Sequence, residues 1–441
     1  MSDEYFKKEP VEKWIIDPIQ RFISNSATSG IILFSAAIIA MIVSNSPWSD
    51  AFHHFWEMEF GFGFNGVYLT KSLHHWINDG LMAIFFFVVG LELKREIIAG
   101  ELNEVKKAML PVGAAIGGMV VPALLYLAFN NSGEAAGGWG IPMATDIAFA
   151  LGVIYLLGDK VPLTLKIFLT ALAIADDIGA VLVIAFFYTS SIDFNSLISG
   201  GIFLLVLITA NKIGVRSTIF YAVVGIGGLW LAFLMSGVHA TIAAVLAAFT
   251  IPANVKISEA GFIANVEKLL VKFRKADPNN VPTVTPEQHD ILQKIRDISK
   301  EALTPLQRLE HGLHPLVAFI IMPIFALSNA GIVLPDNLGE VLLSPVTIGV
   351  FLGLLVGKVV GVTGMVYLFT KMKWAQLPEG VNNRHILGAG FLAGVGFTMS
   401  LFISGLAFTD DELILHAKFG ILLASLLASV CGFLLLRSAA K

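Results

Sequence analysis

Long apolar runs follow one another along almost the whole 441-residue chain, separated mostly by short polar joints. Many of these runs reach about 20 residues, the length at which a helix crosses the hydrocarbon core of a bilayer. Only 14% of the residues are charged, against about 25% in soluble domains. Because backbone groups in lipid must be hydrogen-bonded within the structure, the sequence predicts an all-α polytopic membrane protein.

We predict twelve membrane-spanning helices in a single transmembrane domain, residues 1–441. Their expected ranges are 28–46, 73–93, 109–130, 137–158, 163–189, 194–211, 217–235, 237–252, 313–333, 341–370, 385–407 and 414–436. On this division, all but three of the 29 lysines and arginines fall at one side; Lys71 and Lys418 lie opposite, and Lys358 lies inside a span. Because positively charged loops remain in the cytoplasm, we expect both termini to be cytoplasmic.

Residues 56–71, "WEMEFGFGFNGVYLTK", connect the first two spans on the outer side. Phe60, Phe62 and Phe64 alternate, and Asn65-Gly66 is a preferred dipeptide of a two-residue hairpin turn. We therefore predict a small extracytoplasmic β-hairpin, with an irregular loop as the alternative. An isolated two-stranded ribbon is marginally stable in water, so pairing with the same hairpin of a second subunit would protect its edge.

Residues 253–306 are a polar insert on the cytoplasmic side, with two expected helices at 258–275 and 286–303. Its stretch "EKLLVKFRKA" mixes apolar and basic positions. This pattern fits either a helix lying on the membrane surface or a solvated linker that contains helices.

Five ionisable side chains fall well inside the expected spans: Asp79, Asp146, Asp176, Asp177 and Lys358. Each costs about 2.5–3.5 kcal/mol at the centre of a membrane helix, so they must face one another or water. Such groups indicate a functional site, and the alternative is a buried ion pair that fixes packing. Asp176 and Asp177 point about 100° apart around a helix, so one can face a cation pathway while the other faces a partner. Lys358 is the only cation of the span at 341–370 and is the expected partner.

Two spans contain residues that interrupt a helix. Pro142 in the fourth span lacks an N–H and leaves a carbonyl of the preceding turn free. The eleventh span carries the glycines Gly388, Gly390, Gly394 and Gly396. These are the middle members of spans 3–5 and 10–12, which enter the membrane from opposite sides. Paired broken crossing helices in inverted repeats indicate a transporter with its site near the bilayer midplane.

Helix ends at such breaks point toward one another, so Asp146 would offset the positive ends and Lys358 the negative ends. Thr145 adds a hydroxyl beside the break in the fourth span. Carboxylates and free carbonyls make a hard-oxygen site that suits a small cation. Protons and a metal cation compete for carboxylate oxygens buried from water. The residues by themselves therefore favour cation/proton exchange.

The chain contains the stretches "ATDIAFALG", "ALAIADDIGA", "SGVHAT", "GLELKRE", "RLEHGLHP" and "GVGFTMSLFISGLAF". As a set, these stretches resemble the NhaA family of sodium/proton antiporters, itself a type example of inverted-repeat transporters. The resemblance extends over residues 20–252 and 305–437. The insert at 253–306 is longer than the corresponding joint of the better-known members.

The resemblance implies a role for each matching residue. Asp177 corresponds to the essential cation-binding carboxylate. Asp176 corresponds to the neighbour that binds the cation or pairs with the membrane lysine, which matches Lys358. Thr145 and Asp146 match the unwound crossing of the fourth span.

The resemblance also implies a pH-sensing cluster at the cytoplasmic funnel, formed by Glu92, Arg95, Glu96, Glu310, His311 and His314. His239 matches a histidine that shifts the pH profile of the family. Histidine titrates in the required range, although a packing role is the alternative for a lone membrane histidine. Asp79 matches a family aspartate that is either regulatory or a structural hydrogen-bond acceptor.

The implied activity is electrogenic, pH-regulated export of Na⁺ or Li⁺ in exchange for inward H⁺, which contributes to cytoplasmic pH and sodium homeostasis. The implied ion-translocating core comprises residues 109–189 and 341–437, with interface helices at 28–93 and 194–333. The protein is expected as a homodimer, joined through the outer hairpin, in the inner membrane of a bacterium, without a cofactor.

The sequence also bears on other classes of function. A sodium-coupled symporter of an organic solute is the alternative, but it would need additional polar groups for the solute. A cation channel would need rings of acids or filter motifs, which the sequence lacks. No nucleotide-binding loop, Cys/His metal spacing or nucleophile motif indicates an enzyme, and no basic stripe with interleaved aromatics indicates a nucleic-acid partner.

Overall fold

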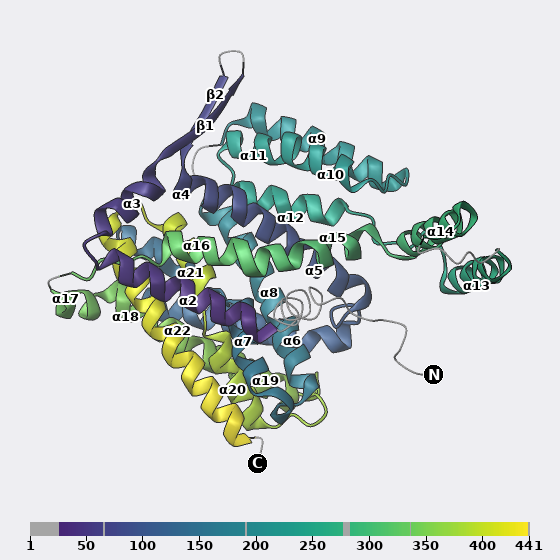
Figure 1. Ribbon diagram of the computed structural model, residues 1–441. Helices are drawn as coiled ribbons and strands as arrows, with labels where there is room; N and C mark the ends of the chain where they lie inside the picture. Colours follow the sequence, from purple (N-terminus) through teal and green to yellow (C-terminus); the bar gives the residue numbers. More distant parts are fainter. Residues whose placement is uncertain (1–25, 65–66, 190–191, 277–282, 336, 440–441) are drawn as a thin grey trace.

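The structure is a computed structural model that describes residues 26–64, 67–189, 192–276, 283–335 and 337–439. Figure 1 shows a bundle of helices from which one β-hairpin and one pair of helices project. The fold is therefore that of an all-α polytopic membrane protein with a small hairpin, as the sequence predicts.

Helical structure coincides with every predicted span. The first half of the chain contains α2 (Ser26–Ser44), α3 (Ser49–Glu57), α4 (Leu73–His75), the π-helical η3 (Trp76–Leu81), α5 (Met82–Ala99), α6 (Val105–Phe129), the 3₁₀ helix η4 (Glu134–Met143), α7 (Ile147–Leu156), η5 (Gly158–Lys160), α8 (Leu163–Phe187) and α9 (Phe194–Lys212). The second half contains α10 (Thr218–Val224), η6 (Gly225–Trp230), α11 (Leu231–Ser236), α12 (Ala240–Thr250), α13 (Glu259–Lys275), α14 (Pro286–Ala302), α15 (Pro305–Leu316), η7 (Val317–Ile321), α16 (Met322–Asn329), α17 (Leu338–Leu343), α18 (Pro345–Leu352), η8 (Gly353–Gly357), α19 (Lys358–Lys371), α20 (Asn383–Ala393), α21 (Phe397–Ala407) and α22 (Asp411–Ala439).

Among the described residues, eight helical segments are long and apolar enough to cross a membrane, and two bent pairs raise this number to ten. The bent pairs are α2 with α3, at 116°, and α20 with α21, at 43°. The two remaining predicted spans are helical over Leu73–Ala99 and over Ala240–Thr250. The second of these is shorter than the sequence predicts, because Gly237 adopts a left-handed conformation (φ 80°) and α12 begins only at Ala240.

The eleven residues of α12 extend only about 16 Å, roughly half the hydrocarbon core. This short helix lies close against α5. A Cβ atom on Gly90 would lie 2.7 Å from the Cβ of Ala248, so only glycine permits this approach.

The helices of spans 3–5 and 10–12 pack against each other, with α6 beside α19 and η4 beside α21. Gly117 and Gly361 mark the closest approach of α6 and α19. A Cβ on Gly117 would lie 2.4 Å from the carbonyl oxygen of Gly361, and a Cβ on Gly361 would lie 2.1 Å from that of Gly117. The two backbones therefore touch, and the broken spans that follow each helix in sequence are brought together.

The hairpin consists of β1 (Glu59–Phe64) and β2 (Val67–Ser72), which pair antiparallel from Glu59 with Ser72 to Phe64 with Val67. The predicted hairpin is confirmed; its expected turn, Asn65-Gly66, lies outside the described residues. The hairpin projects beyond the helices at the top of Figure 1. The Trp76 indole N–H donates to the Phe60 carbonyl at 2.7 Å, which ties β1 to the following helix.

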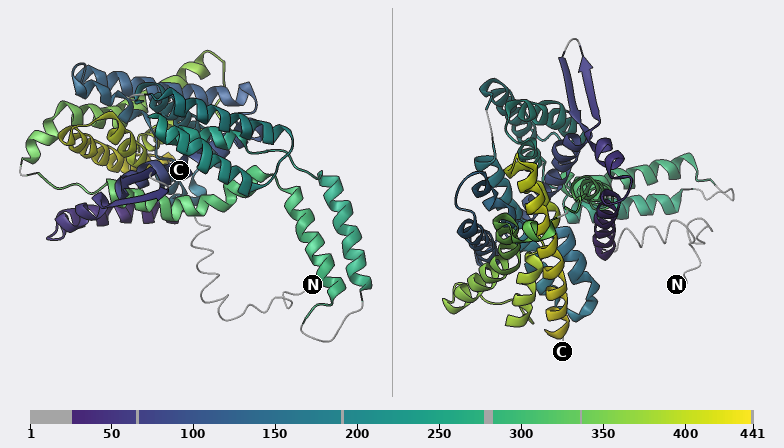
Figure 2. Two further views of the ribbon diagram at one scale, coloured as in Figure 1. Left: turned by 90° about the horizontal axis from the view of Figure 1, so that it is seen from above. Right: turned by 90° about the vertical axis from the view of Figure 1, so that its left-hand side faces the viewer.

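The insert folds as the two predicted helices. Figure 2 shows α13 and α14 side by side, projecting from the bundle. Leu269 and Ile291 are buried within this pair, and Thr285 caps α14 by exchanging hydrogen bonds with Gln288.

Candidate functional site

The two broken spans cross where their helices are interrupted. In the first, residues 144–146 separate η4 from α7; in the second, residues 394–396 separate α20 from α21. The backbone N–H of Asp146 donates to the carbonyl of Val395 at 2.7 Å and joins the two interruptions. At Gly394 a Cβ would lie 2.4 Å from the Leu354 carbonyl oxygen, which explains a glycine at this crossing.

Asp146 lies between the N-termini of two helices and is 1% exposed. Its Oδ1 accepts from the backbone N–H of Phe149 at 3.0 Å, which caps α7. Its Oδ2 accepts from the backbone N–H of Thr398 at 3.1 Å and from the Thr398 hydroxyl, in the first turn of α21. One carboxylate thus meets the positive ends of both helices, the placement expected from the sequence.

Lys358, the first residue of α19, reaches the same region from a third helix. Its ammonium group forms an ion pair with Asp176 Oδ2 and donates to the Thr145 hydroxyl at 3.0 Å. The Thr145 Oγ1 lies 2.7 Å from Asp176 Oδ2 and 2.8 Å from the carbonyl oxygen of Ala393, so it can donate to either. Ala393 ends α20, so the lysine is linked through Thr145 to a negative helix end.

Asp177 is the unsatisfied member of the site. Asp176, Asp177, Lys358 and Thr145 are all fully buried, with 0% exposure. Both carboxylate oxygens of Asp177 lack a hydrogen-bond partner among the residues that the structure describes, as does Oδ1 of Asp176. An isolated carboxylate buried away from water is very costly, and it must be neutralised by a proton or a cation.

The charges at the site can be counted from these contacts. Asp176 and Lys358 compensate each other, and Asp146 is held by two helix N-termini. Asp177 has no described partner in hydrogen-bond contact, although its carboxylate lies within electrostatic range of Asp176, Asp146 and Lys358. The site therefore has room for one more positive charge, and three free carboxylate oxygens are available to bind it.

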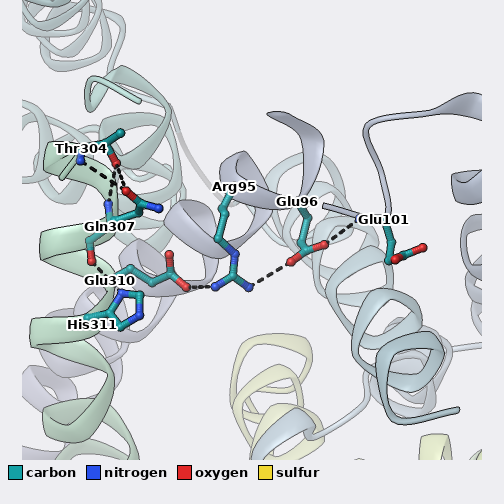
Figure 3. Close-up of polar contacts among 7 residues, drawn as sticks. All are labelled: Arg95, Glu96, Glu101, Thr304, Gln307, Glu310 and His311. Atoms are coloured by element: carbon teal, nitrogen blue, oxygen red, sulfur yellow. Dashed lines mark hydrogen bonds and ion pairs between the residues drawn. The ribbon is translucent and has the colours of Figure 1, made fainter. Parts of the chain in front are cut away.

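A second ionic cluster joins the end of α5 to α15 (Figure 3). Arg95 forms an ion pair with Glu310 and donates to Glu96 Oε1 at 2.9 Å. Glu96 Oε2 accepts from the backbone N–H of Glu101 at 3.0 Å, as Figure 3 shows. His311, in the same cluster, approaches the Gln307 carbonyl through Nδ1 at 2.9 Å.

Two more of the predicted residues belong to this cluster through their charges. Glu92 interacts electrostatically with Glu310, Arg95 and Glu96, and His314 interacts with Arg95 and His311. Glu92 is also within electrostatic range of Asp177. The second cluster is therefore close enough for its charge to influence the first.

His239 and Asp79 have other neighbours. His239 Nε2 lies 2.8 Å from the carbonyl oxygen of Tyr188, directly beyond α8. Asp79 pairs with His75 at 3.3 Å, and its backbone carbonyl accepts from the Trp230 indole at 3.2 Å. Asp79 and His239 are within electrostatic range of each other.

A sequence model of the family described as Na+/H+ antiporter 1 matches residues 20–436. The chain belongs to this family. A relative from Oleidesulfovibrio alaskensis, named Na(+)/H(+) antiporter NhaA, is 49% identical over 97% of this chain and 95% of its own length. Relatives from Saccharophagus degradans, named Na(+)/H(+) antiporter NhaA 1, and from Acidithiobacillus ferrooxidans, named Na(+)/H(+) antiporter NhaA, are 47% and 49% identical. They cover 98% and 95% of this chain, and 97% of each relative is matched.

Family membership confirms the resemblance read from the six motifs. With its apolar spans, the chain is a multi-pass membrane protein of a transporter family. One residue of the site escaped the sequence analysis. Thr398 donates to Asp146 through both its backbone and its hydroxyl, and the available signal was a hydroxyl residue just after the glycine-rich break, as Thr145 lies beside the other break.

Proposed function

We propose that this protein is a secondary antiporter that exports Na⁺, or Li⁺, in exchange for inward H⁺, without a cofactor. The observation that carries the proposal is the buried Asp177 carboxylate without a described partner, next to the free Oδ1 of Asp176. The family supports the same activity, because the relatives are named Na⁺/H⁺ antiporters. Their names give no support to the alternative, a symporter of an organic solute.

The exchange follows from competition for the same oxygens. A proton on Asp177 removes its charge, and a bound Na⁺ does so through hard-oxygen ligands from Asp177 and Asp176. Because a cation on Asp176 competes with the ammonium group of Lys358, its binding would release this lysine from its ion pair. Lys358 is thus a second group that can lose a proton, and electrogenic exchange needs more than one proton for each Na⁺.

Residues at the crossing of the two broken spans hold the charged side chains of the site in place. Thr145 orients Asp176 and Lys358, while Asp146 holds the two positive helix ends together. We assign ion translocation to residues 109–189 and 341–437, and an interface role to residues 28–93 and 194–333. A relative movement of these parts would expose Asp177 to either side in turn.

We assign pH regulation to the second ionic cluster, with its members Glu92, Arg95, Glu96, Glu310, His311 and His314. The support is the contact of Arg95 with Glu96 and Glu310, the electrostatic interactions of Glu92, His311 and His314 with these residues, and the electrostatic range from Glu92 to Asp177. His239 belongs to this assignment as a separate histidine, near Asp79.

We propose that the protein lies in the inner membrane of a bacterium with both termini in the cytoplasm, and that it forms a homodimer. The orientation rests on the lysine and arginine distribution, and the dimer on the open edges of β1 and β2. Deletion of residues 59–70 should convert dimers to monomers, measured by light scattering in detergent, while exchange in vesicles persists. Dimers of unchanged stability would exclude the hairpin as the contact.

Exchange itself is tested with a pH-sensitive dye in proteoliposomes that contain the purified full-length protein. Addition of Na⁺ should move protons out of acidified vesicles between pH 6 and 9, with the higher rates at alkaline pH. The same record with K⁺ as the added salt is the control. A Na⁺ response no larger than the K⁺ response would reject the proposal.

A further inference from the structure

A cavity of about 610 Å³ opens at the beginning of α6 and α8, and its lining differs in charge from the ion site. Three lysines line this cavity: Lys106 and Lys107 from the first turn of α6, and Lys373 from the loop after α19. Among the described lining residues, Glu101 supplies the negative charge. The cavity therefore carries a net positive charge.

Two helix N-termini add to this charge. The first turns of α6 and α8 both contribute lining residues, Lys106 and Thr164 among them. The residues that precede these helices, Glu104 and Pro162, form no side-chain cap hydrogen bond in the described structure. The first peptide N–H groups of both helices thus lack a side-chain acceptor, and the positive ends of two helix dipoles meet at the cavity.

The lysines are largely free to bind a ligand. Lys107 is partly engaged, because its ammonium group pairs with Glu104 at 3.0 Å. Lys106 and Lys373 are exposed, and no ion pair is formed by either in the described part of the chain. Lys373 has a φ of 59° and is the left-handed residue that ends α19, where the N–H of Trp374 donates to the Phe369 carbonyl at 3.0 Å.

The rest of the lining is apolar. Leu110, Pro111 and Phe168 are buried lining residues, and Trp374, also in the lining, is 54% exposed. Tryptophan and lysine at the end of a membrane helix are typical of the headgroup level of a bilayer. Basic pockets between membrane helices on the cytoplasmic side bind anionic lipid headgroups, and the orientation assigned above places this cavity on that side.

We propose that this cavity binds a phosphoryl group, in the headgroup of an anionic phospholipid or as free phosphate. Lys106 and Lys373 are the principal cationic contacts, the helix N-termini supply N–H donors, and the apolar wall receives the first part of an acyl chain. The site is distinct from the ion site, because its described lining residues include none of Thr145, Asp146, Asp176, Asp177 and Lys358.

Native mass spectrometry of the full-length protein in detergent, titrated with phosphatidylglycerol, tests the proposal. Each lysine near an anionic lipid contributes about a fivefold change in affinity, so the double variant Lys106→Ala/Lys373→Ala should bind this lipid about 25-fold more weakly. The matched control is Lys160→Ala/Lys371→Ala, which removes two lysines outside the cavity. Equal losses in both double variants, or no loss in the first, would overturn the proposal.

Two additional arms sharpen the test. Gln376→Glu places a carboxylate at the cavity without removing a contact, and it should also weaken phosphatidylglycerol binding by about fivefold. Unchanged binding in this variant would contradict the proposal even if the lysine variants unfolded. Competition by millimolar inorganic phosphate would identify free phosphate as a ligand, whereas lipid binding that resists phosphate but exceeds that of phosphatidylcholine would identify the headgroup.

Discussion

Lys358–Asp176 and Arg95–Glu310 are both ion pairs between helices that are far apart in sequence, but water reaches them differently. The first pair is 0% exposed on both side chains, whereas Arg95 is 37% and Glu310 is 6% exposed. Asp177, beside the first pair, has two oxygens without a described partner, while Glu96, beside the second, accepts from Arg95 and from the Glu101 backbone.

The difference in burial separates the roles that similar side chains can take. A charge in the buried pair is compensated by a few fixed groups, so any arriving ion must replace one of them. The second pair is partly hydrated, so a change in its protonation alters the local charge without such a replacement. On this ground we propose transport for the buried site and regulation for the second, partly exposed cluster.

The largest effect is expected at Asp177. Asp177→Asn preserves the shape of the side chain but removes the charge that binds either ion, so Na⁺-driven proton movement should fall to that of protein-free liposomes. Asp159→Asn, which changes an exposed aspartate in the short helix η5, is the matched control. Wild-type exchange by a correctly folded Asp177→Asn protein would remove Asp177 from the mechanism.

The two ion pairs, Lys358–Asp176 and Arg95–Glu310, should also differ in their contribution to stability. Lys358→Met leaves Asp176 buried and uncompensated, which should lower the free energy of unfolding by about 3–5 kcal/mol. Arg95→Met breaks a pair whose arginine is 37% exposed and leaves the buried Glu310 without this partner, which should cost less, about 1–3 kcal/mol. Thermal unfolding in detergent compares the two, and adding Asp176→Asn to Lys358→Met should recover much of the loss. Equal destabilisation by both single variants would show that burial does not separate the pairs.

A smaller effect is expected at Thr398, which donates to Asp146 where the two broken spans cross. Thr398→Val keeps the side-chain volume but removes the hydroxyl donor to Asp146, which should cost about 1–3 kcal/mol and slow exchange. Thr409→Val removes an exposed hydroxyl that donates to Glu134 at 2.8 Å and should have little effect. A Thr398→Val protein with wild-type stability would show that its hydroxyl is dispensable for Asp146.

The smallest effect is expected in the second cluster. Glu310→Gln removes one negative charge, so protonation of the remaining members becomes less favourable and activation should begin at lower pH. We expect a shift of about 0.5 pH unit with little change in the maximal rate. Glu301→Gln, at an exposed pair with Lys256, is the control. A shift toward higher pH, or a lost maximal rate with an unshifted profile, would contradict the regulatory role.

Local sequence features predicted much of the fold and part of the candidate site. Apolar runs predicted the positions of the helices, and the alternating residues before Asn65 predicted the hairpin strands. Lys358 could be matched with an aspartate because its span contains no other cation. Pro142 and the glycines around Gly394 predicted where the helices break.

Features that depend on three-dimensional contact were not predictable in the same way. Thr398 donates a hydrogen bond to Asp146, which lies 252 positions earlier in the sequence, and no sequence periodicity links the two residues. Whether Asp177 has a hydrogen-bond partner depends on the side chains that other helices place beside it, and the sequence of its own helix does not specify these. The late start of α12, at Ala240, depends on the left-handed Gly237, which the apolar pattern does not reveal.

The central claim is that a proton and an alkali cation take turns on the buried oxygens of Asp177. Proton release measured in weakly buffered detergent solution at alkaline pH, as Na⁺ is added to the purified protein, tests it most directly. Wild type should release at least one proton for each Na⁺ bound, and Asp177→Asn should release none. Saturable Na⁺ binding by the wild type without proton release would contradict the account.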